Sequence, residues 1–245
     1  MVFRGFLTSL FAFIVLRGKI GKVDKYAYLI ALTLPFATLG LFNGIRSWGA
    51  GPTIIIITAT PLVNYLIGPF IGRKISLASV IGLVLVLGGV IVARWGGEFK
   101  WEGFLWSVFG TVMNGILYEF FSRSKSTPTQ KCFYSSFGMG LLGLILSLTM
   151  DSDASWQQVF QTDLLFSVLI FAFIGGFIYW LANLIAFENL PTTEASILAQ
   201  GETPAVIIGA WFFLGEQLSL LQWTGVGIAL LGAMYLSSWL SKQKN

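Results

Sequence analysis

The chain contains no histidine and a single cysteine, Cys132, in 245 residues. One thiol cannot form an intrachain disulfide or a thiolate metal cluster. Without histidine the chain also lacks the usual metal ligand and the usual general base at neutral pH. These absences exclude haem and zinc sites built on histidine, as well as hydrolases built on a serine–histidine pair. We therefore expect no metal, no cofactor and no enzymatic activity.

Charged residues are scarce as well: they make up 11% of the chain, against 56% hydrophobic residues. A soluble domain carries roughly 25% charged residues, so this chain has too few to cover a water-facing surface. We therefore predict an all-α integral membrane protein whose main partner is the lipid bilayer. No basic run is long enough to indicate nucleic-acid binding.

A membrane-spanning helix needs about 20 mostly apolar residues. Nine candidate segments meet or approach that length, at 2–16, 26–45, 50–71, 76–93, 103–122, 132–149, 163–187, 193–214 and 218–240. The first segment is the shortest and carries Arg4. We interpret it as a retained helix rather than a signal peptide, because no small-x-small cleavage site follows it.

Lysine and arginine are distributed unevenly between the predicted loops. If the loop at 17–25 is cytoplasmic and the helices alternate in direction, eleven cations lie on the cytoplasmic side and four on the opposite side. Cytoplasmic loops collect lysine and arginine, so this asymmetry predicts a cytoplasmic C-terminus. Short connections and the absence of an Asn-x-Ser/Thr site favour a bacterial inner membrane.

A spacing of 143 residues relates the two halves of the chain. The matched pairs are Thr60 with Thr203, Pro61 with Pro204, Gly72 with Gly215, Gly82 with Gly225, and Gly89 with Gly232. The two proline-bearing helices are third and eighth in order, so alternation makes them antiparallel and the repeat inverted. Inverted repeats of hydrophobic helices are typical of transporters, which bind their substrate between the halves. We therefore predict an inverted-repeat helical bundle.

The segment 194–204, followed by the Gly215-Glu216 turn and the glycines at 225 and 232, resembles the end of an EamA-type repeat of the drug/metabolite transporter superfamily. The first half echoes these positions, with Arg73 where the turn would have its acid. The resemblance implies a ten-helix architecture of five plus five. Residues 1–94 would then be a first repeat of four helices and residues 101–241 a second repeat of five. Either a leading helix is missing from the first repeat, or the chain is a natural nine-helix variant.

The resemblance implies a secondary transporter, often an exporter, of small metabolites such as amino acids or drug-like amines. No lysine or arginine lies at mid-depth in a predicted helix, so a phosphate-bearing substrate would lack a positive clamp. A neutral, zwitterionic or cationic substrate is favoured instead. The alternative functions are a non-transporting scaffold and a channel, although neither rings of charge nor filter loops are visible in the sequence.

Glu202 is the leading candidate for the substrate site, because it lies near the centre of the helix predicted at 193–214. Pro204 cannot donate a hydrogen bond to the carbonyl of Gln200 and so frees it. A carboxylate beside a freed carbonyl suits a cation, an ammonium group or a coupling proton. The matched first-half position is Ala59, so the fold does not require an acid there. The alternative is a buried acid that is hydrogen-bonded across helices.

Other polar and aromatic residues recur at helical spacing, and we predict that they line the substrate cavity. They are Asn64 in 50–71, Asn114 and Tyr118 in 103–122, and Tyr179 and Asn183 in 163–187. The helices that carry Pro61 and Pro204 are the predicted gates. The alternative role is structural: asparagine bonding between helices and tyrosine anchoring at the membrane interface. Glu119 we interpret as the helical (i, i+4) partner of Arg123.

Overall fold

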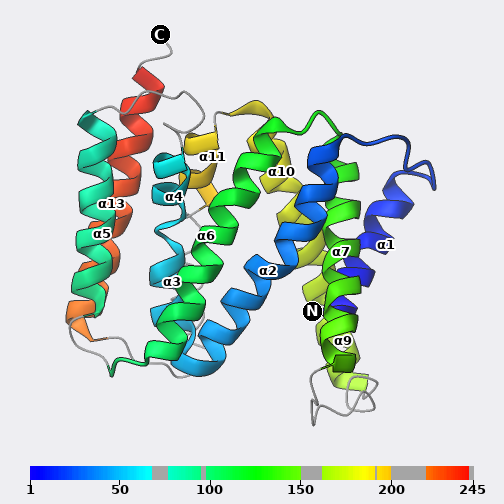
Figure 1. The fold of residues 1–245 in the computed structure, drawn as a ribbon, viewed down its shortest axis with the longest axis horizontal. Coiled ribbons are helices and arrows are strands. Elements are labelled where there is room, and N and C mark those ends of the chain that lie inside the picture. Colours follow the sequence, from blue (N-terminus) through cyan, green and yellow to red (C-terminus); the bar gives the residue numbers. More distant parts are fainter. Residues whose placement is uncertain (68–76, 95–97, 150–161, 191, 200–218, 243–245) are drawn as a thin grey trace. The chain divides into compact units, whose positions relative to one another are not determined.

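The computed structural model describes residues 1–67, 77–94, 98–149, 162–190, 192–199 and 219–242 (Figure 1). These residues are almost entirely helical and contain no β-strand. The elements are α1 (Val2–Val15), α2 (Lys25–Trp48), α3 (Ala50–Ile57), α4 (Thr60–Ile67), α5 (Leu77–Arg94), α6 (Trp101–Arg123), α7 (Pro128–Thr149), α9 (Thr162–Ile170), the π-helical η2 (Phe171–Ile178), α10 (Tyr179–Asn189), α11 (Thr192–Ala199) and α13 (Leu220–Lys242).

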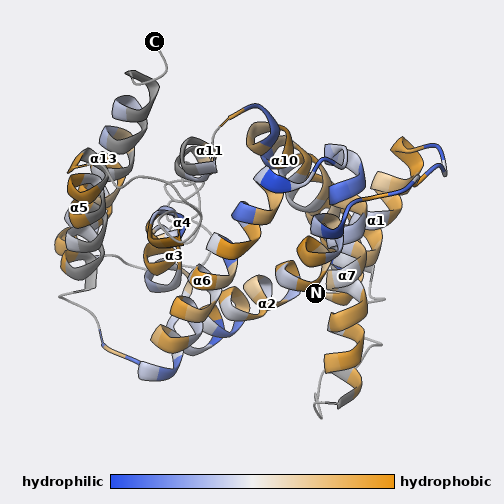
Figure 2. Ribbon diagram, turned by 45° about the horizontal axis from the view of Figure 1, so that its top comes forward, coloured by the Kyte–Doolittle hydropathy of each residue, from blue (hydrophilic) through white to orange (hydrophobic). Residues whose placement is uncertain are grey.

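The all-α prediction is confirmed, and each of the nine predicted segments contains helical residues. Four stretches of the described chain are long and apolar enough to cross a membrane: Lys25–Trp48, Ala50–Ile67, Trp101–Arg123 and Leu165–Asn189. Two predicted helices prove to be irregular. The third is interrupted between α3 and α4, and the seventh changes to a π-helix at η2. Figure 2 shows the helices coloured mainly as hydrophobic and several of their connections as hydrophilic.

The chain forms two compact units. The first unit comprises Met1–Phe36 and Phe120–Asn189, and the second comprises Ala37–Glu119 and Leu190–Asn245. Each unit takes residues from both halves of the sequence, and α2 and α6 contribute one end to each unit. The repeats predicted at 1–94 and 101–241 therefore describe a relationship within the sequence rather than compact bodies, and they stay a prediction.

In the first unit α1 packs along α7 and η2. The backbones of Gly5 and Gly140 approach so closely that a side chain on Gly5 would overlap α7. One turn further along α1, the Thr8 hydroxyl donates to the carbonyl of Ala172 in η2 at 3.0 Å. Small residues at helix contacts let backbones approach in this way, which favours association inside a membrane.

In the second unit α5 and α13 pack side by side and run in opposite directions (Figure 1). Their closest contact joins Gly89 of α5 to Gly225 and Ala229 of α13. Both glycines belong to the pairs that the 143-residue spacing matches. In addition, α4 packs against α11, which lies in the helix predicted to match α3 and α4. Helices related by the sequence repeat thus pack against each other, which supports the inverted arrangement.

Candidate functional site

The interruption between α3 and α4 gives the second unit a discontinuous helix. Pro61 has no N–H, so the carbonyl of Ile57 cannot be bonded in the helical pattern. The hydroxyl of Thr60 donates to that carbonyl at 2.7 Å, and the hydroxyl of Thr58 donates to the carbonyl of Ile55. Two threonine hydroxyls therefore replace the backbone bonds that the interruption removes. Both threonines are buried, so water does not compete for these carbonyls.

Helix α6 contacts this discontinuous helix on both sides of the interruption. The hydroxyl of Thr111 lies 3.2 Å from the carbonyl of Ile56, at the end of α3. Four residues later, Gly115 meets α4, and the side-chain amide of Asn64 donates to its carbonyl at 2.6 Å. The glycine permits this approach, because a side chain at position 115 would overlap Val63. Thus α6 contacts α3 through the Thr111 hydroxyl and is joined to α4 by the hydrogen bond from Asn64.

The contacts of α6 follow one row of residues spaced by four. Gly103 meets Trp48, Ser107 lies beside Gly44 and Thr53, and Thr111 and Gly115 contact α3 and α4 as described; the row continues to Glu119. Residues four apart share one face of a helix, so small side chains in this row bring the backbones together. The sequence interpretation missed Thr111 and this row. Its signal was the recurrence of Gly, Ser and Thr at every fourth residue.

Asn64 is the predicted site residue whose surroundings are best defined. Its side chain is 1% exposed, and its amide nitrogen donates to Gly115. Its carbonyl oxygen Oδ1 is also buried and accepts no hydrogen bond among the described residues. A buried acceptor without a donor is unfavourable by about 1–3 kcal/mol, so such groups in native proteins usually have a ligand, water or functional role.

Two other predicted residues belong to the stretch of α6 that Asn64 contacts. Asn114 precedes Gly115 and Tyr118 follows it by three residues; Asn114 is half-buried, and Tyr118 is buried. Glu119 is also buried, with 5% exposure. Its backbone N–H is the regular helical partner of the Gly115 carbonyl that Asn64 also contacts. The structure therefore brings Asn64 to the stretch of α6 that carries Asn114, Tyr118 and Glu119.

Tyr179 and Asn183 belong to the first unit and lie on α10. The amide of Asn183 donates to the carbonyl of Tyr179 at 3.1 Å, within the same helix. This local bond is the structural role that we weighed for asparagine, and it leaves the predicted substrate contact of Asn183 untested. Gln200, Glu202 and Pro204 lie outside the described residues. Their predicted roles therefore stay predictions.

Comparisons with known proteins place this fold among transporters. A model of the EamA-like transporter family matches residues 101–238, more than half of the 245 residues. A protein of Aeromonas salmonicida (strain A449) described as "Probable 4-amino-4-deoxy-L-arabinose-phosphoundecaprenol flippase subunit ArnE" is 29% identical over 96 residues, which cover 39% of this chain and 80% of that protein.

Two further similarities agree with this result. The uncharacterized protein y4nH of Sinorhizobium fredii (strain NBRC 101917 / NGR234) is 33% identical over 70 residues, which cover 26% of this chain and 60% of that protein. A crystal structure of a protein with 13% sequence identity has a TM-score of 0.72 and covers 98% of this chain and 86% of its own. At that identity the structural similarity shows a shared fold alone.

Proposed function

Because the chain belongs to the EamA-like transporter family, we propose that this integral membrane protein is a secondary transporter of small neutral, zwitterionic or cationic metabolites. The family consists of transporters rather than enzymes, and the predicted resemblance to the drug/metabolite type is confirmed. The finer proposal is export of amino acids or drug-like amines by alternating access. The structural observation that carries it is the discontinuous α3–α4 helix, whose α4 segment bears the buried Asn64.

The interruption suits a gate because its hydrogen bonds are made by side chains. A continuous helix resists bending, since each backbone bond is part of one ladder. At Thr58 and Thr60 the bonds come from hydroxyls, which can rotate and donate to other carbonyls when the backbone moves. We propose that α4 changes its angle to α3 at this point. Pro61 is the hinge residue, and Pro204 is its proposed counterpart in the second repeat.

Asn64 is the proposed substrate contact in the first repeat. Its Oδ1 atom accepts hydrogen bonds only, so it suits an ammonium, amide or hydroxyl donor of the substrate. Asn114 and Tyr118 are proposed to complete this part of the site from α6. Tyr179 and Asn183, on α10 of the first unit, are proposed substrate contacts on the ground of the sequence alone. In the second repeat, Gln200 and Glu202 are the proposed ligands, and Glu202 is the group proposed to couple transport to protons.

Transport assays in proteoliposomes test this proposal directly. We expect saturable uptake of one class among amino acids, amines and aromatic metabolites, and a faster rate when a pH gradient is imposed. Glu202→Gln should remove the effect of the gradient, because an amide cannot take up a proton. Flux that does not saturate would favour a channel. A folded protein that moves none of these solutes would favour the scaffold.

A pair of asparagine variants tests the proposed binding residue. Asn64→Leu removes the buried acceptor at similar volume, so we expect KM for the transported solute to rise about 10-fold or more, as for the loss of a hydrogen bond of roughly 1.5 kcal/mol. Asn189→Leu is the matched control, because Asn189 is exposed and donates to the carbonyl of Ile185 in its own helix. Equal KM values for the two variants would show that Asn64 does not contact the substrate.

We further propose a bacterial inner membrane location with the C-terminus in the cytoplasm. The excess of lysine and arginine in alternate loops supports this orientation. Cys132 is fully buried, so it gives a silent background for cysteine labelling. A membrane-impermeant thiol reagent should label Lys100→Cys in intact spheroplasts and Lys19→Cys only after permeabilisation. The reverse labelling pattern would show that the chain has the opposite orientation in the membrane.

A further inference from the structure

The loop between α1 and α2 presents a row of cations whose role the transport proposal does not explain. Arg17, Lys19 and Lys22 lie in this loop, and Lys25 is the first residue of α2; all four are exposed. Lys125, in the short connection between α6 and α7, is exposed as well. We call these five residues the basic rim. All of them belong to the first unit.

Hydrogen bonds fix the shape of this loop at two points. The side-chain amide of Gln130, in the first turn of α7, donates to the carbonyl of Ile20 at 2.6 Å. At the end of the loop, the Asp24 carboxylate accepts hydrogen bonds from the hydroxyl of Ser124 at 2.9 Å and from the backbone N–H of Lys125. The two segments that carry the basic rim are thus joined to each other.

The turns of the loop are also defined by its backbone. Gly18 and Gly21 have φ angles of 73° and 68°, which glycine adopts readily. Arg17 has a φ of 52°, in the left-handed region that a side chain makes unfavourable. Its backbone N–H donates to the carbonyl of Ile14 and so closes the last turn of α1. The rim is therefore a folded structure and not a loose basic tail.

Asp24 is the only acidic residue of the segments 16–25 and 124–130, which hold the whole basic rim. Its carboxylate accepts hydrogen bonds from the Ser124 hydroxyl, from the backbone N–H groups of Lys125 and Tyr26, and from the Ala27 backbone N–H at 3.0 Å. The carboxylate is thus committed to holding the loop together. Five positive charges then face one negative charge across the two segments, and the surface suits an anionic ligand.

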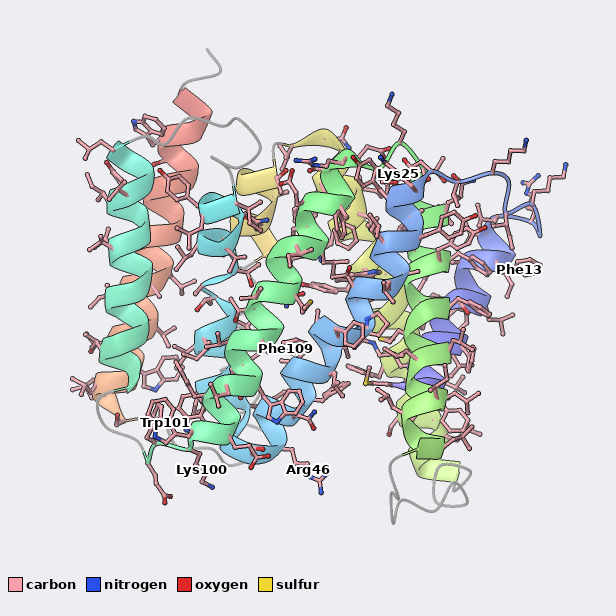
Figure 3. The ribbon with its side chains drawn as sticks, in the orientation of Figure 1. Phe13, Lys25, Arg46, Lys100, Trp101 and Phe109 are labelled. Atoms are coloured by element: carbon pink, nitrogen blue, oxygen red, sulfur yellow. The ribbon has the colours of Figure 1, made fainter. Side chains whose placement is uncertain are left out.

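Exposed apolar side chains border the basic rim on the two helices that enter and leave the loop. On α1, Ile14 and Val15 are 61% and 54% exposed; on α2, Tyr28 and Leu32 are 56% and 58% exposed. Figure 3 places Phe13, another exposed side chain, at the end of α1 that leads into this loop. Cations beside lipid-exposed apolar helix ends match both parts of a phospholipid, its phosphate and its acyl chains.

We propose that the basic rim is a binding site for an anionic phospholipid, whose headgroup phosphate lies among these five cations and whose acyl chains lie along the ends of α1 and α2. The fixed loop lowers the entropy lost on binding, because its backbone is already ordered before the lipid binds. Each lysine near an anionic lipid surface contributes a factor of about five to affinity. This inference is independent of the transported solute.

Two double variants with the same charge change test the site. Lys19→Gln with Lys22→Gln removes two cations of the rim, whereas Arg46→Gln with Lys100→Gln removes two exposed cations of the second unit; Figure 3 shows Arg46 and Lys100 extending away from the ribbon. The purified full-length chain in neutral detergent is titrated with phosphatidylglycerol, and binding is followed by native mass spectrometry. We expect about 25-fold weaker binding for the rim variant and an unchanged affinity for the control.

Asp24→Ala distinguishes binding to a folded site from attraction of the lipid by net positive charge alone. This variant has one negative charge fewer, so attraction by net charge alone would make phosphatidylglycerol bind more tightly. If the site depends on the fixed loop, binding becomes weaker instead. Tighter binding by Asp24→Ala would overturn the proposal, as would equal losses in the two double variants. No preference of the wild-type chain for phosphatidylglycerol over phosphatidylcholine would also overturn it.

Discussion

Two adjacent glycines in α5 provide a matched test of how closely this helix packs on α13. A methyl group on Gly89 would lie 2.5 Å from the backbone nitrogen of Ala229 and 2.6 Å from the carbonyl oxygen of Gly225. These are backbone atoms of α13, so no side-chain rotation can relieve the overlap. A methyl group on Gly88 would meet nothing within 4 Å.

The magnitude follows from these two environments. Both Gly→Ala substitutions gain about 0.5–1 kcal/mol from the better helix propensity of alanine. Carbon atoms pack favourably at about 3.5–4 Å, so Gly89→Ala also forces the two helices apart by roughly 1 Å. Overpacking of this kind destabilises by about 1–3 kcal/mol. Because the propensity term is common to both variants, the overpacking term is the expected difference between them.

Thermal unfolding in one detergent, followed by tryptophan fluorescence, measures this difference. In a chain of 150–250 residues, 1 kcal/mol shifts Tm by about 2–4 °C, so Gly89→Ala should melt about 2–12 °C below Gly88→Ala. Gly88→Ala itself should melt at or slightly above the wild-type temperature. Equal Tm values for the two variants would refute the close contact between α5 and α13, and with it this support for the inverted repeat.

Two further predictions concern the ends of helices in the first unit. Burial acts to raise the pKa of Asp24, but hydrogen bonds from Lys125, Ala27 and Ser124 outweigh it and hold the pKa below its ordinary value of 3.8. The stability that Asp24 contributes is therefore fully present above pH 3.8 and is lost as the pH falls through the lowered pKa. In that pH range the Tm of the wild type should drop by more than the Tm of Asp24→Asn. Parallel curves of Tm against pH for the two proteins would contradict this. Lys131 is 1% exposed and its ammonium donates to the carbonyl of Phe121 at 3.2 Å, in the last turn of α6. Lys131→Met keeps the buried aliphatic part of the side chain but removes this charged donor, so we expect the free energy of unfolding to fall by about 1.5–3 kcal/mol. The control is Lys125→Met, at an exposed position. Equal losses in the two variants would argue against this role of Lys131.

The helices could be predicted from the sequence because membrane crossing imposes a length on each apolar segment. The predicted 26–45 and 103–122 correspond to Lys25–Trp48 and Trp101–Arg123, which extend past the apolar stretch at their ends. Hydropathy cannot find those ends, since polar residues continue a helix as readily as they begin a loop. Hydropathy also could not predict the π-helical η2, because Phe171–Ile178 is uniformly apolar.

The candidate site was predictable only in part. Asn64 was identified as a polar residue in an apolar helix, and it proved to be buried with one unbonded oxygen among the described residues. The role of Thr111 was missed, because a threonine in a membrane helix ordinarily bonds its own backbone and gives no sign of a second contact. The Thr111 hydroxyl does reach Ser107 of its own helix at 2.8 Å, and only the fold reveals Ile56 beside it. Pairing across helices is not encoded in local sequence.

The interruption at Pro61 also changes the argument for the second repeat. We predicted that Pro204 frees the carbonyl of Gln200 for a ligand, by the same rule that frees the carbonyl of Ile57. In the first repeat that carbonyl is taken by the hydroxyl of the residue before the proline, Thr60, at 2.7 Å.

The Thr-Pro pair recurs at 203–204, and Thr203 follows Gln200 by three positions, as Thr60 follows Ile57. We therefore predict that the Thr203 hydroxyl bonds to the Gln200 carbonyl. A carbonyl that already accepts a hydroxyl is a weaker cation ligand than a free one. The proposed coupling role therefore depends on the Glu202 carboxylate. Thr203→Val should then leave the pH-gradient effect on transport intact, whereas Glu202→Gln should remove it. Loss of the effect in Thr203→Val would instead show that proton coupling depends mainly on the Gln200 carbonyl and the Thr203 hydroxyl.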